Sequence, residues 1–210
     1  RPRPQIRHVR YMSIGPQVEI YTDRDNKVKY WEAEASWWTQ FNTGDWYRFQ
    51  FSRKYDVVAS GFRPSKRKPH LSIPAGTYKF NTFGTGPSTT RSRKDRLSLS
   101  LEGGGYYTGR RYEISIRNNY RPSGQLSIET EFETNLLRLP QGNATIQTLS
   151  NRLVYAFNTD FFVKLFAQWN NDSQQMSGNF LLSYRYRPGS DIFFVFDHGF
   201  DTQSGIERQN

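Results

Sequence analysis

An alternation of apolar and polar residues with a period of two is the feature of this sequence that most constrains its fold. In residues 96–102 leucines alternate with serines, and in residues 126–133 apolar residues and threonine alternate with serine and glutamate. The same pattern occurs in residues 31–37, 47–52, 112–117 and 180–186. Successive side chains of a β-strand point to opposite faces of a sheet, whereas a helix has a period of about 3.6. The sequence therefore predicts an all-β protein whose strands have one apolar and one polar face.

Eleven strands are expected, separated by turn residues. Their expected ranges are about 8–22, 27–40, 45–55, 75–84, 91–102, 106–118, 125–134, 143–157, 160–169, 179–187 and 191–199. Glycine, proline, asparagine and aspartate mark the turns between them, including residues 84–87 and the three consecutive glycines at 103–105. No segment has the pattern of a long helix.

The expected connections alternate in length from residue 118 onward. Tight connections are expected near 119–124, 158–159 and 188–190, longer ones at 135–142 and 170–178, and the longest of all at 56–74. In an up-and-down antiparallel sheet successive turns lie at opposite ends of the strands. Outer-membrane barrels have short turns on the periplasmic side and longer loops outside. The alternation fits such a barrel.

The composition favours a membrane barrel over an ordinary globular domain. Only 35% of the residues are hydrophobic, yet 16% are aromatic. A globular domain is usually about 45–50% apolar, whereas only every second residue of a barrel strand faces lipid. The expected strands, of about 10–14 residues, exceed the usual ~5–6 of soluble sheets, and tyrosine and tryptophan near their ends fit interfacial girdles. We therefore predict an antiparallel up-and-down transmembrane β-barrel, or the C-terminal part of a larger one.

A soluble protein remains the alternative. In a soluble antiparallel sandwich or small barrel, the apolar faces would pack inward and the charged faces would meet water. Such a protein would be a β-rich binding module for polyanions or glycans. The two interpretations differ in where the aromatic face lies.

The C-terminal third resembles a known bacterial module. The resemblance is carried by residues 151–157 (NRLVYAF), 161–170 (FFVKLFAQWN) and 182–196 (LSYRYRPGSDIFFVF), and the run YRPGSD is its most specific part. Residues 73–80, 109–111 and 139–142 also fit. The chain resembles the C-terminal domain of a family of uncharacterised bacterial outer-membrane proteins. In that family the domain typically follows a module similar to family-nine carbohydrate-binding modules.

The resemblance implies a β-barrel in the bacterial outer membrane and no established activity. Its partners would be the lipid bilayer and lipopolysaccharide, with glycans or other outer-membrane subunits as further candidates. The carbohydrate-binding module is missing from the chain, and the family continues into one more apolar strand where this chain ends with residues 207–210. We therefore expect residues 1–210 to be a single barrel domain lacking that module and the last strand. It would serve as a channel, a transport component or a membrane anchor for a glycan-binding module.

The longest connection carries a cluster of basic residues. The chain has a formal net charge of +10, and Arg63, Lys66, Arg67 and Lys68 lie close together in this connection. On an outer loop these side chains would contact the phosphates of lipopolysaccharide through charge-assisted hydrogen bonds; the alternative is a solvated loop without a ligand. No nucleic-acid-binding motif accompanies the cluster, so no nucleic-acid partner is expected.

Charged residues on the polar face form a candidate lumen. They are Glu129, Glu131, Glu133, Arg152, Lys164 and Arg185, and the other strands add Glu32, Glu34, Arg48, Glu113 and Arg117. In an open barrel these charges would set the selectivity of the pore. Alternatively they pair with one another in a ladder that fills or stiffens the interior.

Catalytic chemistry has little support in the sequence. The three histidines, His8, His70 and His198, are far apart, and cysteine is absent. Neither a His-x-x-x-His pair nor a Gly-x-Ser-x-Gly motif occurs. We therefore expect no catalytic, metal or cofactor site, and a protein that is not an enzyme.

Overall fold

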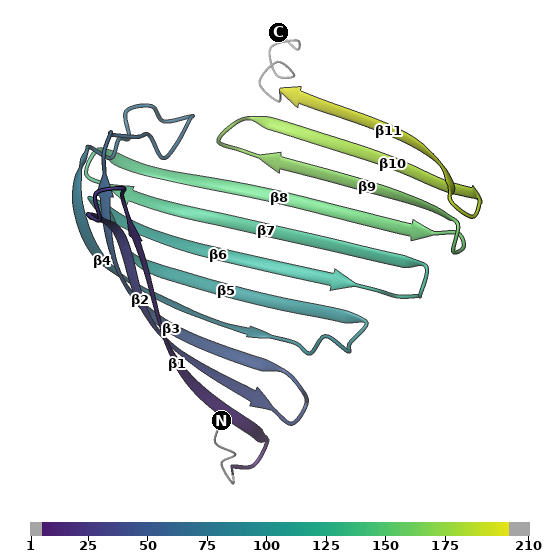
Figure 1. Cartoon of the computed structure of the whole chain (residues 1–210), viewed down its shortest axis with the longest axis horizontal. Coiled ribbons are helices and arrows are strands. Elements are labelled where there is room, and N and C mark those ends of the chain that lie inside the picture. The colour runs from purple at the N-terminus through teal and green to yellow at the C-terminus, as the bar shows by residue number, and fades with distance from the viewer. Residues whose placement is uncertain (1–5, 202–210) are drawn as a thin grey trace. The chain divides into compact units, whose positions relative to one another are not determined.

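A computed structural model describes residues 6–201 as one antiparallel β-sheet with strands in sequential order (Figure 1). The strands are β1 (Val9–Thr22), β2 (Val28–Phe41), β3 (Trp46–Val58), β4 (Gly76–Ser88), β5 (Asp95–Tyr106), β6 (Gly109–Tyr120), β7 (Leu126–Leu139), β8 (Gly142–Ala156), β9 (Phe161–Asn170), β10 (Gln175–Arg187) and β11 (Ser190–Asp201). The all-β class, the eleven strands and the up-and-down order are confirmed. Residues 207–210, after which the resembled family would continue into one more strand, lie outside the described residues.

Within residues 6–201 there is no helical segment that could span a lipid bilayer.

Two predicted turns are wrong because their glycines lie inside strands. Residues 84–87 belong to β4, and residues 103–105 belong to β5. A Cβ at Gly86 would collide with the carbonyl oxygen of Leu99, and a Cβ at Gly105 would lie 2.6 Å from Cβ of Phe80. These glycines therefore allow a close approach of neighbouring strands rather than a reversal of the chain.

The predicted alternation of short and long connections is also largely wrong. β7 and β8 are joined by residues 140–141 alone, and β9 and β10 by residues 171–174, because the strands extend into the segments expected to be loops. The connection between β3 and β4, residues 59–75, is the long one, as predicted. We refer to it as the β3–β4 loop.

Two compact units divide the chain. The first comprises Arg1–Arg91, Ser98–Ser115 and Thr134–Ile146, and the second comprises Ser92–Leu97, Ile116–Glu133 and Gln147–Asn210. Strands β5 to β8 contribute residues to both units, and the hydrogen-bonded strand order runs through them.

In the first unit the apolar face of the sheet is the exposed face. Ile14 on β1, Trp37 on β2 and Phe49 on β3 are opposite one another in register. Ile14 is 77% exposed and Val18 is 66% exposed, and Trp37, Phe49 and Phe83 on the same side are also exposed. We call this side of the sheet the apolar face and the opposite side the charged face.

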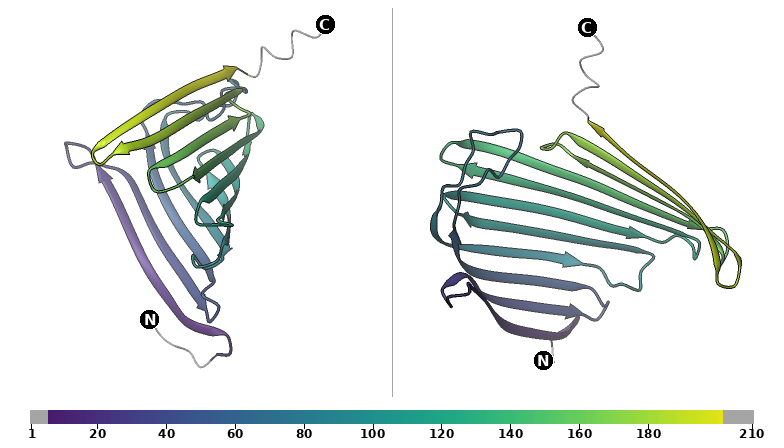
Figure 2. Two further views of the ribbon diagram at one scale, coloured as in Figure 1. Left: turned by 90° about the vertical axis from the view of Figure 1, so that its right-hand side faces the viewer. Right: turned by 45° about the horizontal axis from the view of Figure 1, so that its top comes forward.

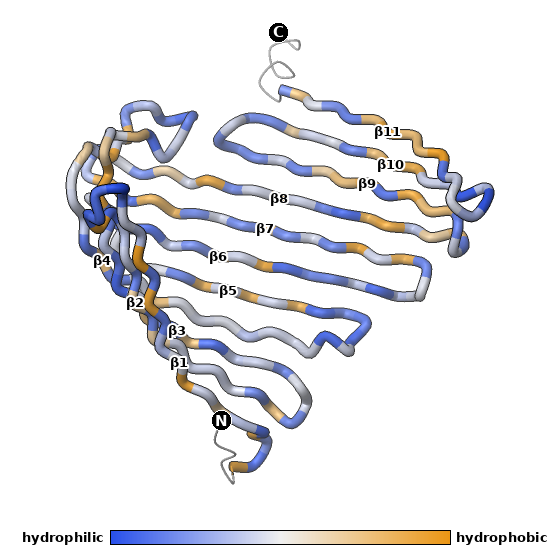
Figure 3. Tube along the Cα trace, viewed as in Figure 1, coloured by the Kyte–Doolittle hydropathy of each residue, from blue (hydrophilic) through white to orange (hydrophobic). Residues whose placement is uncertain are grey.

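The second unit is two-sided only in part, because Phe162 and Leu181 are among the apolar residues that share the side of Arg185. Leu182 lies opposite Val163 on β9 and Phe194 on β11, whereas Arg185 lies opposite Asp191 on the other side. Strand β11 departs from the pattern, because Phe193 and Val195 fall on the side of Arg185 and are exposed. Figure 3 shows this departure as a long orange stretch in β11.

The buried apolar residues of the described chain gather where the β3–β4 loop meets the sheet. The cluster consists of Leu71, Ile73, Leu137, Leu139 and Ala144, with Tyr78, Tyr106, Tyr107 and Ile146 packed against it. Figures 1 and 2 show the loop lying beside the connected ends of β7 and β8. The compact packing of the first unit is therefore at one end of its strands, and the loop is part of it.

Candidate functional site

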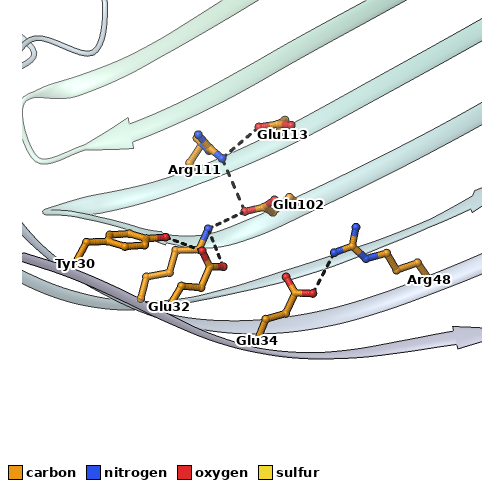
Figure 4. A network of polar contacts seen from close by, with 8 residues as sticks. Tyr30, Glu32, Glu34, Arg48, Glu102, Arg111 and Glu113 are labelled. Atoms are coloured by element: carbon orange, nitrogen blue, oxygen red, sulfur yellow. Dashed lines mark hydrogen bonds and ion pairs between the residues drawn. The ribbon is translucent and has the colours of Figure 1, made fainter. Parts of the chain in front are cut away.

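A network of charged side chains on the charged face of the first unit is the candidate functional site (Figure 4). The register of β2 and β3 places Glu32 opposite Lys54. Lys54 Nζ lies 3.4 Å from Oε1 of Glu32 and 3.9 Å from Oε1 of Glu102 on β5. Arg111 on β6 continues the network, 3.8 Å from Glu102 and 3.2 Å from Glu113. Charged side chains from four strands therefore form ion pairs with one another across the charged face.

Tyr30 and a second ion pair extend the network along β2 and β3. The hydroxyl of Tyr30 donates a 2.6 Å hydrogen bond to Oε2 of Glu32. Arg48 Nη2 lies 3.2 Å from Oε1 of Glu34, and its guanidinium carbon lies 4.8 Å from the ring centre of Trp38. An arginine held by both a carboxylate and an aromatic ring is fixed in position rather than freely solvated.

A cavity of about 180 Å³ lies over the centre of this network. Its lining includes Lys54, Glu102 and Arg111, together with Tyr107 from the turn between β5 and β6. The hydroxyl of Tyr107 donates a 2.8 Å hydrogen bond to Oδ2 of Asp56. Burial, together with this hydrogen bond, raises the pKa of Tyr107, so its phenol is neutral at physiological pH. The cavity is thus walled by paired charges and by aromatic rings.

The predicted lumen residues of the second unit are partly brought together. Arg152 Nη1 lies 3.5 Å from Oε2 of Glu129, and Arg117 forms an ion pair with Glu131. Asn119 donates a 2.7 Å hydrogen bond from Nδ2 to Oε1 of Glu129. These contacts support the self-paired alternative for this strip.

The other predicted lumen residues lie on β7, β9 and β10. Glu133 is half-buried on β7. Lys164 lies between Val154 and Leu181 in the register of β8, β9 and β10. Arg185 Nε lies 3.1 Å from Oδ1 of Asp191, and its Nη1 lies 3.9 Å from Oδ1 of Asp160.

The four predicted lipopolysaccharide contacts lie on the β3–β4 loop and are exposed. They are Arg63, Lys66, Arg67 and Lys68. Lys68 Nζ donates a 2.6 Å hydrogen bond to the carbonyl oxygen of Asn143 near the start of β8. Contact of these residues with lipopolysaccharide stays a prediction.

The sequence interpretation missed Lys54, Glu102 and Arg111, the residues that join the network. The signal was present in the strand alternation. Lys54 is six positions after Arg48, and Arg111 is two positions before Glu113. Glu102 follows Ser98 and Ser100 at every second position of the serine-leucine alternation. Residues an even number apart share a face of a strand, so the same rule that selected Arg48 and Glu113 also selects these three.

Metal chemistry receives no support from the described side chains. Within residues 6–201, no group of three or more histidine, aspartate or glutamate side chains is arranged so that it could hold a metal ion.

No protein-family model matches the chain, and neither the curated proteins nor the solved structures include a match to it. The resemblance to an outer-membrane family therefore stays a prediction.

Proposed function

We propose that the chain is the membrane-spanning β-barrel, or part of the barrel, of a bacterial outer-membrane protein that conducts solutes and is not an enzyme. The observation that carries this proposal is the polarity of the sheet. In the first unit the apolar side chains of one face are exposed, and charged side chains on the opposite face pair with one another.

The exposed apolar face supports a lipid environment. Leaving apolar surface in water costs about 25 cal/mol per Å², and a large contiguous apolar surface marks a site of contact with membrane or protein. In the first unit this surface runs across neighbouring strands through Ile14, Trp37 and Phe49. Trp31 and Tyr55 stack at the end of the same face, with ring centres 6.1 Å apart. Aromatic side chains at this level fit the membrane interface.

The charged face supports a wet lumen. The ion pairs centred on Lys54 keep opposite charges together while leaving each of these side chains about one fifth exposed. Interiors of outer-membrane barrels are polar, and charged side chains there tune selectivity. The chain would therefore serve as a channel or transport component. Anchoring of a glycan-binding module is compatible with the same barrel.

The test is insertion into a bilayer followed by conductance measurement. Refolded protein is mixed with liposomes and floated on a density gradient, and the same protein is added to a planar lipid bilayer under voltage. We expect flotation with the lipid and stepwise conductance. A protein that stays monodisperse without detergent and binds heparin or a glycan column would contradict the proposal and favour the soluble binding module.

A further inference from the structure

The β3–β4 loop is fixed to the charged face of the first unit rather than extended away from it. Leu71 and Ile73 are completely buried. They pack with Leu137 and Leu139 on β7, in a cluster that also includes Tyr78. Tyr78 lies opposite Asp56 in the register of β3 and β4, and therefore belongs to the charged face. The two apolar side chains of the loop thus anchor it on the side that carries the ion pairs.

Polar contacts hold the rest of the loop in place. Phe62 and Ile73 exchange backbone hydrogen bonds of 3.0 and 2.9 Å, which close the loop at its base. Gln141 Nε2 donates a 3.3 Å hydrogen bond to the carbonyl oxygen of Ser72, and Ser65 is 2% exposed. Two buried anchors, a backbone bridge and a side-chain hydrogen bond therefore hold the loop against the sheet.

The turn between β5 and β6 packs under the loop. The ring of Tyr107 meets that of Phe62 at 5.3 Å, and its hydroxyl binds Asp56 on the charged face. The cavity over the ion pairs is lined by the same Tyr107. Tyr107 therefore connects the loop, through Phe62, to the charged face, through Asp56.

The loop and the charged network of the first unit carry opposite net charge. Residues 59–75 contain Arg63, Lys66, Arg67 and Lys68 and no acidic residue. In the network on the charged face of the first unit, acidic side chains outnumber basic ones: Glu32, Asp56, Glu102 and Glu113 stand with Lys54 and Arg111. The loop therefore adds positive charge beside a face whose own side chains would favour cations.

We propose that the β3–β4 loop is a constriction in the lumen that narrows the path and disfavours the passage of cations. This inference rests on the channel function proposed above. A loop docked on the lumenal face reduces the cross-section open to solutes. Its basic side chains repel cations and attract small anions at the narrowest point.

The test compares single-channel conductance of the whole chain with that of variants whose loop is released. In Leu71→Asp/Ile73→Asp the anchors become charged and cannot stay buried. In a second variant, residues 63–70 are replaced by two glycines, which removes the loop tip without placing charge in the cluster. Heat-modifiable migration on gels verifies that each variant has assembled. We expect at least a twofold rise in conductance in both variants.

Ion selectivity tests the role of the charges. In a tenfold KCl gradient, Lys66→Gln/Arg67→Gln should shift the reversal potential toward that of K⁺. The matched control is Arg24→Gln/Lys27→Gln, which removes one arginine and one lysine from the exposed turn between β1 and β2 at the same end of the strands. The control should produce a clearly smaller shift.

The outcomes separate this inference from the channel proposal. If the wild type conducts and an assembled loop variant has the same conductance, the constriction alone is overturned. Equal shifts of the reversal potential in Lys66→Gln/Arg67→Gln and in the control variant would overturn it as well. Silence of both the wild type and the loop variants in bilayers would overturn the channel proposal and the constriction with it. A silent wild type that conducts when the loop is removed would support a loop that closes the path completely.

Discussion

Tyr107 and Asp56 are 51 residues apart in sequence, and the Tyr107 hydroxyl donates a 2.8 Å hydrogen bond to the Asp56 carboxylate. The bond joins the turn between β5 and β6 to β3, two strands away in the sheet order. The ring of Tyr107 also meets Tyr78, Phe80 and Tyr106 at centre distances of 4.9 to 5.4 Å. One turn residue thus links the charged face to the buried cluster under the β3–β4 loop.

Tyr107→Phe should destabilise the first unit while keeping its ring packing. A hydrogen bond to a charged group contributes about 1.5–3 kcal/mol, and partial exposure places the expected loss at about 1–2 kcal/mol. The measurement is the urea midpoint of the protein refolded in detergent micelles. Tyr186→Phe is the control, because Tyr186 is half exposed in β10. Equal midpoints for the two variants would show that the bond to Asp56 has no structural role.

The same pair predicts a dependence on alkaline pH. The raised pKa of Tyr107 means that the folded state holds the phenol proton more tightly than the unfolded chain does. The stabilisation is therefore fully present below pH about 10, the ordinary pKa of tyrosine, and is lost as the pH rises through the raised pKa. Wild-type stability should fall relative to Tyr107→Phe only above pH about 10. If the difference in stability between the wild type and Tyr107→Phe already changes near pH 8, the raised pKa of Tyr107 is contradicted.

Lys54 should couple energetically to Glu102. Lys54→Met leaves Glu32 and Glu102 without the cation between them, and we expect a loss of about 1–3 kcal/mol, between the values for exposed and buried ion pairs. Adding Glu102→Gln should recover part of that loss. A double-mutant cycle on unfolding free energies measures the coupling, which we expect at about 0.5–1.5 kcal/mol. Strict additivity would mean that Lys54 and Glu102 do not stabilise the protein as a pair.

The strand pattern was predictable because alternation reports directly on which face a side chain occupies. Eleven strands follow from it, and so does the placing of Arg152 and Glu129 on one face, where they pair. The glycine-rich segments were misassigned because glycine serves both turns and close strand contacts. Only the neighbouring strand decides between these roles, as Leu99 does for Gly86.

The docking of the β3–β4 loop was not predictable from local sequence. Leu71 and Ile73 are two apolar residues in a basic, proline-containing segment, and their partners Leu137 and Leu139 lie more than sixty residues further along the chain. Their contact depends on which strand ends meet in the sheet. The sequence therefore indicated a basic outer or solvated loop, whereas the tertiary contacts of these two side chains hold it against the sheet.

Substitutions at Leu182 and Arg185 test the assignment of faces in the second unit. Leu182 lies on the apolar face opposite Val163 and Phe194, and Arg185 lies on the other side beside Asp191. An arginine at a lipid-facing midplane position costs about 2–4 kcal/mol. Leu182→Arg should therefore impair assembly strongly, and Arg185→Leu should leave it nearly intact. Heat-modifiable migration after refolding into liposomes measures both. If Arg185→Leu impaired assembly more than Leu182→Arg, the two faces would be exchanged.

Labelling of single cysteines tests the orientation of the strand ends. The chain has no cysteine, so Arg24→Cys and Thr159→Cys each introduce one reactive thiol. Arg24 is in the turn between β1 and β2, at the same end of the strands as the β3–β4 loop, and Thr159 is in the turn between β8 and β9 at the other end. A membrane-impermeant maleimide added to intact cells should label Arg24→Cys and spare Thr159→Cys. Labelling of Thr159→Cys alone would invert the proposed topology.

The neighbouring tryptophans Trp37 and Trp38 offer the most direct test of the claim that the apolar face meets lipid. Trp37 is 48% exposed on the apolar face, opposite Ile14 and Phe49, whereas Trp38 lies on the charged face with Arg48 over its ring. The protein has five tryptophans, and two variants would each retain one of this pair with the others changed to phenylalanine. The measurement is fluorescence quenching in liposomes by lipids with brominated acyl chains and by aqueous acrylamide. We predict that the brominated lipids quench Trp37 and barely affect Trp38, and that acrylamide quenches Trp38 more than Trp37. Stronger quenching of Trp38 by the brominated lipids, or equal quenching of both, would contradict the account.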